Sequence, residues 1–186
     1  MDSVKATLDD EPANRQHLSM TYDIRPERPD DAAEIRQVVT AAFADAPHSD
    51  GTEGAIVDAL RADDALTLSL VAVADGKITG HVAFSPVTID GGDVGWFGLG
   101  PVAVSPDRQR QGIGGALVRA GLDRLRDRGA GGCVVLGDPG YYGRFGFATD
   151  PQLRYPDAPA PYFMRLAFGP EIPAGCVAYH PGFAAR

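Results

Sequence analysis

Residues 109–115 read Gln109-Arg110-Gln111-Gly112-Ile113-Gly114-Gly115, and this stretch decides the fold because it joins an expected strand to an expected helix. Residues 98–104, before it, are apolar enough for a buried strand. After it, apolar residues recur at helical spacing as far as Leu125, and Gly129 can end the helix. A glycine-rich turn at a helix start exposes unpaired backbone N–H groups at the positive end of the helix dipole, which favours phosphate groups.

The spacing of the glycines excludes two common phosphate-binding loops. The stretch lacks the Gly-Lys-Ser/Thr ending of a P-loop, and Leu117 stands where a dinucleotide fingerprint has its third glycine. The residues therefore predict an anion site of another kind. A turn that merely needs flexible residues is the alternative interpretation.

Two motifs in order carry a family resemblance. Gln-x-x-Gly-x-Gly, after a strand ending Val104-Ser105-Pro106, resembles the acetyl-CoA motif of the GNAT N-acetyltransferase superfamily. The string 142–147, after the short apolar run 133–136, resembles the family's Tyr-x-x-x-Gly-Phe. Residues 98–104 and 135–147 are similar to the YhbS-like bacterial subgroup, and the resemblance runs from Ile24 to Phe183.

This resemblance implies the α/β (α+β mixed sheet) acyl-CoA N-acyltransferase fold. Its central sheet is mixed, mostly antiparallel and splayed at its central strands, with helices on both faces. Periodicity and turn residues agree with that fold. The expected strands are 22–26, 66–74, 77–89, 94–104, 132–136, 162–168 and 175–180. The expected helices are one capped by Asp30 or Asp31 with Ile35, Val38, Val39, Ala42 and Phe43 inward, one at 53–62, and the one after the glycine loop.

Length and composition limit the function classes. A chain of 186 residues predicts one domain, residues 21–186, after a disordered lead-in at 1–20. A net charge of −8 argues against a nucleic-acid partner. Two cysteines are too few for a disulfide framework, and no apolar run or signal peptide points to a membrane. The expected compartment is the cytoplasm, and the oligomeric state, a homodimer included, stays open.

The resemblance implies acetyl-CoA as cosubstrate and no metal. Backbone N–H groups of residues 110–115 would bind its pyrophosphate, and Gly112 and Gly114 would allow close approach. Pro101 predicts a bulge that parts its strand from 132–136, and the pantetheine arm would enter this gap and pair with the backbone of 102–104. The N–H of Val102 would stabilise the oxyanion. The expected cofactor-binding residues are Val102, Ala103, Val104, Gln109, Arg110, Gln111, Gly112, Ile113, Gly114 and Gly115.

Tyr142 is the expected catalytic residue. It occupies the tyrosine position of the second motif, and its phenol would protonate the departing CoA thiolate. The alternative is that Tyr142 packs in the core, as aromatic residues usually do. Tyr141 is interpreted as packing or pocket wall. Where the family often has Asn, this chain has Asp138.

The general base stays open at this point. The family often uses a Glu on the strand 94–104, which here has no acid inside it. The candidates are Asp93, Glu53, His81, Ser85 and His180, each with a structural alternative. Proton removal by a chain of waters, without a dedicated base, is a further possibility.

Three hypotheses remain. The first is an N-acetyltransferase in which an amine of a small molecule or peptide attacks acetyl-CoA directly. The second is a non-catalytic acyl-CoA-binding or sensing module, which the missing acid favours. The third is a structural or interaction protein whose glycines only form turns. The acceptor is expected to meet residues 30–62 and the proline-rich segment 151–161.

Overall fold

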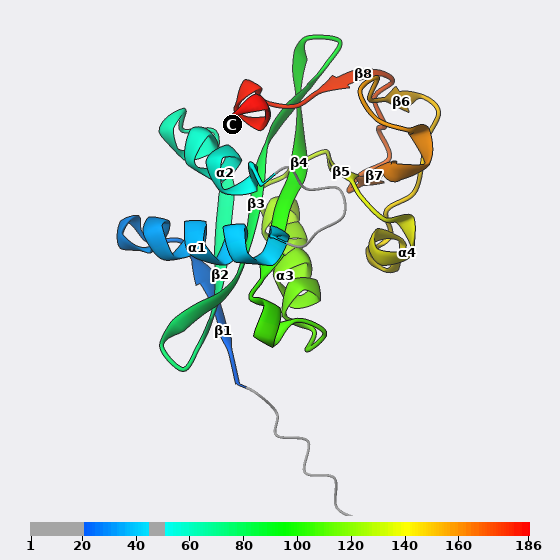
Figure 1. The fold of residues 1–186 in the computed structure, drawn as a ribbon. Coiled ribbons are helices and arrows are strands. Elements are labelled where there is room, and N and C mark those ends of the chain that lie inside the picture. Colours follow the sequence, from blue (N-terminus) through cyan, green and yellow to red (C-terminus); the bar gives the residue numbers. More distant parts are fainter. Residues whose placement is uncertain (1–20, 45–50) are drawn as a thin grey trace, which may run out of the picture.

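The structure is a computed structural model in which residues 21–44 and 51–186 are described. Its centre is an eight-stranded sheet in the order β1-β2-β3-β4-β5-β7, with β8 pairing with β3 and β6 (Figure 1). Neighbouring strands are antiparallel except β4 with β5 and β6 with β8. The strands are β1 Asp23–Pro26, β2 Leu68–Ala74, β3 Lys77–Ile89, β4 Gly92–Val104, β5 Gly132–Leu136, β6 Leu153–Arg154, β7 Phe163–Ala167 and β8 Gly175–Ala178.

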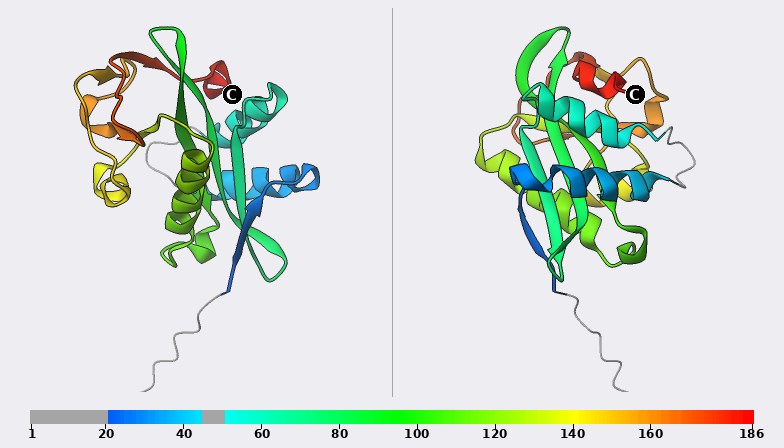
Figure 2. Two further views of the ribbon diagram at one scale, coloured as in Figure 1. Left: turned by 180° about the vertical axis from the view of Figure 1, so that it is seen from behind. Right: turned by 60° about the vertical axis from the view of Figure 1, so that its left-hand side comes forward.

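Helices cover both faces of this sheet, as predicted. Helices α1 and α2 lie side by side over one face, and α3 lies on the other, which Figure 2 shows from behind. The helices are α1 Ala32–Phe43, α2 Glu53–Ala62, α3 Ile113–Asp127 and the short α4 Pro139–Tyr142. Helix α2 has the bounds that the sequence predicted, and α3 begins inside the glycine stretch.

Helix α1 packs through its predicted apolar face. Ile35, Val38 and Val39 are buried, and they contact Val57 of α2 and Ala103 of β4 in one hydrophobic cluster. Burial of a side chain of this size contributes about 2 kcal/mol. The cluster fixes α1 and α2 over the half of β4 that leads into the glycine loop.

The prediction that Asp30 or Asp31 caps α1 is wrong, because neither side chain forms a capping hydrogen bond in the structure. Asp31 occupies the N-cap position, but its carboxylate forms no hydrogen bond to the helix N–H groups. It accepts the backbone N–H of Arg28 at 2.7 Å and pairs with the Arg25 guanidinium at 2.6 Å. The Arg25 hydrogen bond holds the pKa of Asp31 below its usual value. The carboxylate thus ties the start of α1 to β1.

Two tight turns set the register of the central strands. Asp75 and Gly76 have φ values of 53° and 75°, as a type I′ hairpin turn requires, and they join β2 to β3. Asp90 and Gly91, at 49° and 81°, join β3 to β4 in the same way. The second turn is shorter than the predicted 90–93, because Gly92 already pairs with Ile89.

Other predicted boundaries shift by a few residues. β2 begins at Leu68, two residues later than predicted, and β7 and β8 end before Phe168 and His180. The expected lead-in 1–20 lies outside the described residues. None of the described helices combines the length and the hydrophobicity that a membrane span needs.

Replacing Gly121 with Ala is expected to lower the free energy of unfolding by about 2 kcal/mol. A Cβ at Gly121 would lie 2.1 Å from Cε2 of Phe84, which is fully buried between α3 and the sheet. The overpacking outweighs the gain in helix propensity. Urea unfolding measures the change. Gly115→Ala, in the same helix, is the control: its Cβ would be 3.4 Å from the nearest atom, so no loss of stability is expected. Equal midpoints for the two variants would contradict the packing argument.

Candidate active site

A gap between β4 and β5 begins where their pairing ends. The two strands pair in parallel from Trp96–Gly132 to Leu99–Val135 and no farther along β4. Beyond Leu99, residues 100 and 101 both lie opposite Ala83 of β3, which makes a bulge at a cis Gly100–Pro101 bond. The predicted bulge and parting of the strands are therefore confirmed.

The backbone of β4 turns hydrogen-bonding groups into this gap. The N–H of Ser105 donates to the Thr79 carbonyl of β3 at 2.9 Å. Because alternate residues of a strand point to opposite edges, Ala103 also faces β3, and Val102 and Val104 face the gap. The carbonyl of Val104 accordingly accepts from the Gln109 side chain at 3.1 Å rather than from β3.

The glycine loop presents the first turn of α3. Gly112 is the N-cap residue with φ 85°, and Arg110 before it has φ 60°. A Cβ at Gly112 would meet no atom within 4 Å, so the space beside it is open. Ile113, Gly114 and Gly115 form the first helical turn, whose N–H groups have no partner within a helix.

The two glutamines of the loop hold its shape. Gln109 bonds to Val104 as above, and Nε2 of Gln111 donates to the Asp107 carbonyl at 3.2 Å. Arg108 pairs with Asp75 at 3.2 Å, which links the loop to the β2–β3 hairpin. These three side-chain contacts hold the loop that precedes α3 in place.

Two arginines lie beside the loop, and neither is among the expected cofactor-binding residues. A Cβ at Gly115 would lie 3.4 Å from a guanidinium nitrogen of Arg119 and 3.9 Å from one of Arg144. Arg144 stacks on the ring of Tyr141 at 3.9 Å. The four-residue spacing of Gly115 and Arg119 on one helix is the signal that could have identified Arg119. The two cations add positive potential at the helix start.

The two tyrosines of α4 have different surroundings. The hydroxyl of Tyr141 would be 3.1 Å from a Cβ at Gly114, so Tyr141 forms a wall of the glycine loop, as predicted. The ring of Tyr142 lies against Gly137 and edge-on to Phe147, with centroids 5.9 Å apart. Tyr142 also packs on the hydrophobic cluster that contains Cys133 of β5.

Burial keeps the Tyr142 phenol protonated. Desolvation is the largest cause that raises the pKa of Tyr142 above its usual value of 10. The Cys133 thiol of the same cluster has a raised pKa for the same reason. A thiol and a phenol placed here are thus both held in their neutral forms.

The structure separates the candidates for a general base. Asp93 lies at the far end of β4 and accepts the Gly95 N–H at 3.0 Å. His180 uses Nδ1 to accept the Gly182 N–H at 3.1 Å, which is a structural contact. His81 and Ser85 are fully buried on β3, opposite Ala103 and Gly98. These two β4 residues flank the bulge on either side. Glu53 begins α2, as predicted.

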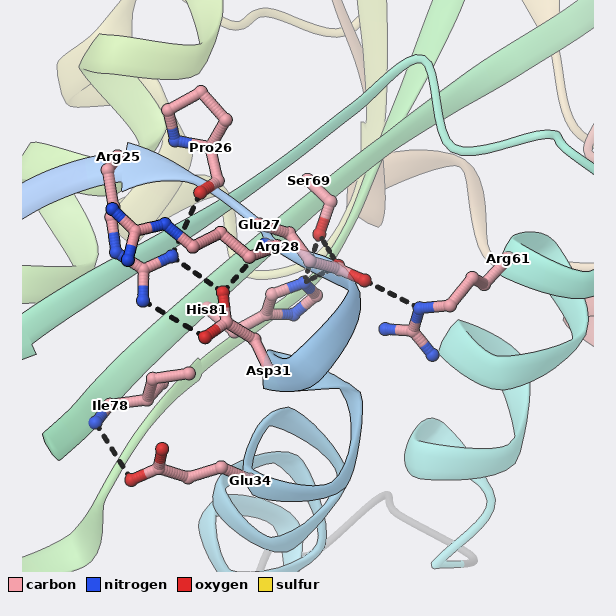
Figure 3. Close-up of polar contacts among 10 residues, drawn as sticks. All are labelled: Arg25, Pro26, Glu27, Arg28, Asp31, Glu34, Arg61, Ser69, Ile78 and His81. Carbon is pink, nitrogen blue, oxygen red and sulfur yellow. Dashed lines mark hydrogen bonds and ion pairs between the residues drawn. The ribbon is translucent and has the colours of Figure 1, made fainter.

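His81 is one end of a polar cluster that the sequence did not predict (Figure 3). Its Nε2 lies 2.8 Å from Oγ of Ser69, and the Ser69 hydroxyl donates to the Glu27 carboxylate in a very short contact. Arg61 of α2 donates to the other Glu27 oxygen at 2.6 Å. Burial and, less strongly, the Arg61 charge lower the pKa of His81 to about 4, against the opposing effect of Glu27. The imidazole is therefore neutral at pH 7.

Comparison with known proteins agrees with this site. The family model described as "Acetyltransferase (GNAT) family" matches residues 32–147, which include the gap and the glycine loop. N-acetyltransferase YhbS of Escherichia coli K12 is 38% identical over 167 residues, which are 86% of this chain and 97% of YhbS.

Solved structures agree with the sequence relatives. A GNAT family acetyltransferase of Brucella melitensis, in complex with acetyl-CoA, is 58% identical with a TM-score of 0.80, covering 88% of this chain and 99% of its own. YhbS of Escherichia coli in complex with CoA is 37% identical with a TM-score of 0.80, and the match covers 89% of this chain and 93% of the YhbS chain. Because the family model matches more than half of its length and the relatives cover most of it, this chain belongs to the GNAT family of acetyltransferases.

Proposed function

We propose that this protein transfers the acetyl group of acetyl-CoA to a primary amine of a small molecule or peptide by direct attack. The observation that carries the proposal is the continuity of β4: the strand borders the open gap at Val102 and Val104 and then leads into the glycine loop. The relatives from Brucella melitensis and Escherichia coli, which were solved with acetyl-CoA and CoA, support the same cosubstrate.

The glycine loop would bind the pyrophosphate. A Cβ at Gly112 would meet no atom within 4 Å, so space for a phosphate is open beside the backbone of residues 110–115. An anion at a helix start gains from both the free N–H groups and the helix dipole. Arg119 and Arg144 would add charge-assisted contacts to the same nucleotide.

The gap would bind the pantetheine arm. Its amides would pair with the backbone groups that Val102 and Val104 turn into the gap, as an added strand does, and the Val104 carbonyl would share its acceptor capacity with Gln109. Ala103, which the sequence placed in the same set, faces β3 and would contribute through its position rather than its N–H. The Val102 N–H would then donate to the thioester oxygen and stabilise the negative charge that develops there.

Tyr142 would complete the transfer as general acid. The amine nitrogen attacks the thioester carbon, a C–N bond forms, the C–S bond breaks, and the thiolate takes the proton of the Tyr142 hydroxyl. A raised phenol pKa would oppose this step if the thiolate kept its usual basicity. The same burial raises the pKa of the Cys133 thiol, so a CoA thiolate in this cluster is made more basic as well.

A panel of amines tests the proposal. Spermidine, 2-phenylethylamine, a lysine-containing peptide and a peptide with a free N-terminus are each incubated with the protein and acetyl-CoA. We expect release of the free CoA thiol together with an amine product heavier by one acetyl group, by mass spectrometry. Calorimetric binding of acetyl-CoA without turnover of any amine would favour the acyl-CoA-binding module instead. No binding of acetyl-CoA at all would contradict both the transferase and the binding module.

The cytoplasmic compartment remains a prediction from the sequence.

A further inference from the structure

We propose that His81 is the base that takes the proton from the acceptor nitrogen, and that Ser69 and Glu27 position it. The inference rests on the proposed transfer to an amine. His81 lies on β3 directly opposite Ala103, the neighbour of Val102 along β4. Paired residues of antiparallel strands have Cα atoms about 5 Å apart, so the imidazole lies within one or two waters of the thioester position.

Hydrogen bonding fixes the tautomer of the neutral imidazole. Ser69 has a single hydroxyl proton and donates it to Glu27. Its oxygen must then accept from His81, so the ring proton is on Nε2, 2.8 Å away. The lone pair is therefore on Nδ1, which points away from Ser69 (Figure 3). A base needs such a free lone pair.

Glu27 would stabilise the protonated ring. Its carboxylate lies 3.9 Å from Nε2 of His81, and Arg61 anchors it from α2. Glu27 and Ser69 border a cavity of about 670 Å³ at the β1–β2 edge, and the Glu27 side chain is 11% exposed. The charged groups that act on the imidazole are thus Glu27, which raises its pKa, and Arg61, which lowers it less strongly.

His81 shares its face of β3 with a second buried polar atom that has no partner. Four buried side-chain atoms in the described part of the chain have no hydrogen-bond partner: Nδ1 of His81, Oγ of Ser85, the Tyr179 hydroxyl and Nη2 of Arg61. Ser85 lies on the same face of β3 as His81 and opposite Gly98, and the ring of Tyr179 covers Gly98. Buried polar atoms are almost always satisfied, here by water or a polar ligand. The atoms of His81, Ser85 and Tyr179 would form a polar path beside the bulge.

The proton step balances without a further reactant. After the C–N bond forms, the nitrogen carries an extra proton and is far more acidic than the free ammonium. Nδ1 of His81 accepts that proton through the polar path, giving an imidazolium that is hydrogen-bonded through Ser69 to Glu27. Because its pKa is low, the ring then releases the proton to solvent and returns to its neutral form. The Tyr142 phenolate, left when the thiolate is protonated, takes up a proton from solvent, so the enzyme is restored with no net proton consumed.

His81→Gln is expected to lower kcat about 100-fold with the best amine of the panel, and to leave the Kd for acetyl-CoA unchanged. His180→Gln is the matched control, since that histidine only caps a turn, and it should keep wild-type kcat. Glu27→Gln should lower kcat without raising KM for acetyl-CoA. If Glu27 had a merely structural role, kcat and KM would change together. Thermal melting verifies that each variant is folded.

A second measurement does not depend on turnover. Nitrogen-15 NMR of the histidine ring is expected to show His81 protonated on Nε2 at pH 7, and Ser69→Ala should shift it towards the Nδ1-protonated form. A ring protonated on Nδ1 in the wild type, or a folded His81→Gln with wild-type kcat, would overturn the assignment. A wild type that releases no thiol with any amine would instead count against the proposed function, while the NMR result still decides the tautomer.

Discussion

Replacing Tyr142 with Phe is expected to lower kcat of acetyl transfer by about 10²-fold to 10³-fold, with no change in the Kd for acetyl-CoA. Phenylalanine keeps the ring that lies against Gly137 and edge-on to Phe147, so packing is preserved. Only the hydroxyl is lost, and the thiolate must then leave without a buried proton donor. The cost appears in kcat because the proton is needed only as the C–S bond breaks.

Tyr141→Phe is the matched control for this variant. Tyr141 lies on the same short helix, but its hydroxyl faces Gly114 of the glycine loop rather than the cluster around Cys133. We expect a change of a few-fold in the binding of acetyl-CoA and a kcat close to wild type. Initial rates of thiol release at saturating acetyl-CoA measure both variants. If Tyr142→Phe keeps a kcat within threefold of wild type, another group protonates the thiolate.

Local patterns in the sequence predicted most of the elements correctly. The hairpin at Asp75-Gly76 follows from residues that tolerate positive φ, and the start of α3 follows from Gly112. These features depend on residues a few positions apart, whose preferences do not change with the rest of the fold. The bulge next to Pro101 is of the same kind, because a proline cannot donate to the ladder.

The polar cluster of the proposed base depended on distant parts of the chain. Glu27 follows β1, Ser69 is on β2 and His81 is on β3, and no spacing along the sequence connects them. They meet because Val71 pairs with His81, which places Ser69 diagonally across from the imidazole. A slip of one residue in that register would move the whole set to the other face of the sheet.

The cap of α1 failed for a related reason. An aspartate before a helix is expected to bond to the helix N–H groups, and the sequence contains nothing that forbids this. Arg25 of β1 competes for the Asp31 carboxylate in the folded chain, and two hydrogen bonds from a positively charged guanidinium are stronger than a cap to uncharged backbone N–H groups. Tertiary contacts therefore override a local preference when they supply an opposite charge.

Gly112→Trp is expected to raise the Kd for acetyl-CoA at least 100-fold. The residue caps α3 at φ 85° with open space beside it, and that space is where the backbone N–H groups face the proposed phosphate position. An indole there would exclude the phosphates from the loop. The loss of several charge-assisted hydrogen bonds, about 3 kcal/mol in total, corresponds to this change in Kd.

Gly129→Trp separates loss of binding from backbone strain. Gly129 lies just beyond the other end of α3 at φ 76°, also with no atom within 4 Å of a would-be Cβ. Both variants should lose about 1–2 kcal/mol of folding free energy to the left-handed conformation, so their melting temperatures should fall together. Only Gly112→Trp should lose acetyl-CoA in a calorimetric titration, because only that end of the helix presents free N–H groups. Equal affinities for the two variants would place the phosphates elsewhere, and the glycines of the loop would then serve the turn alone.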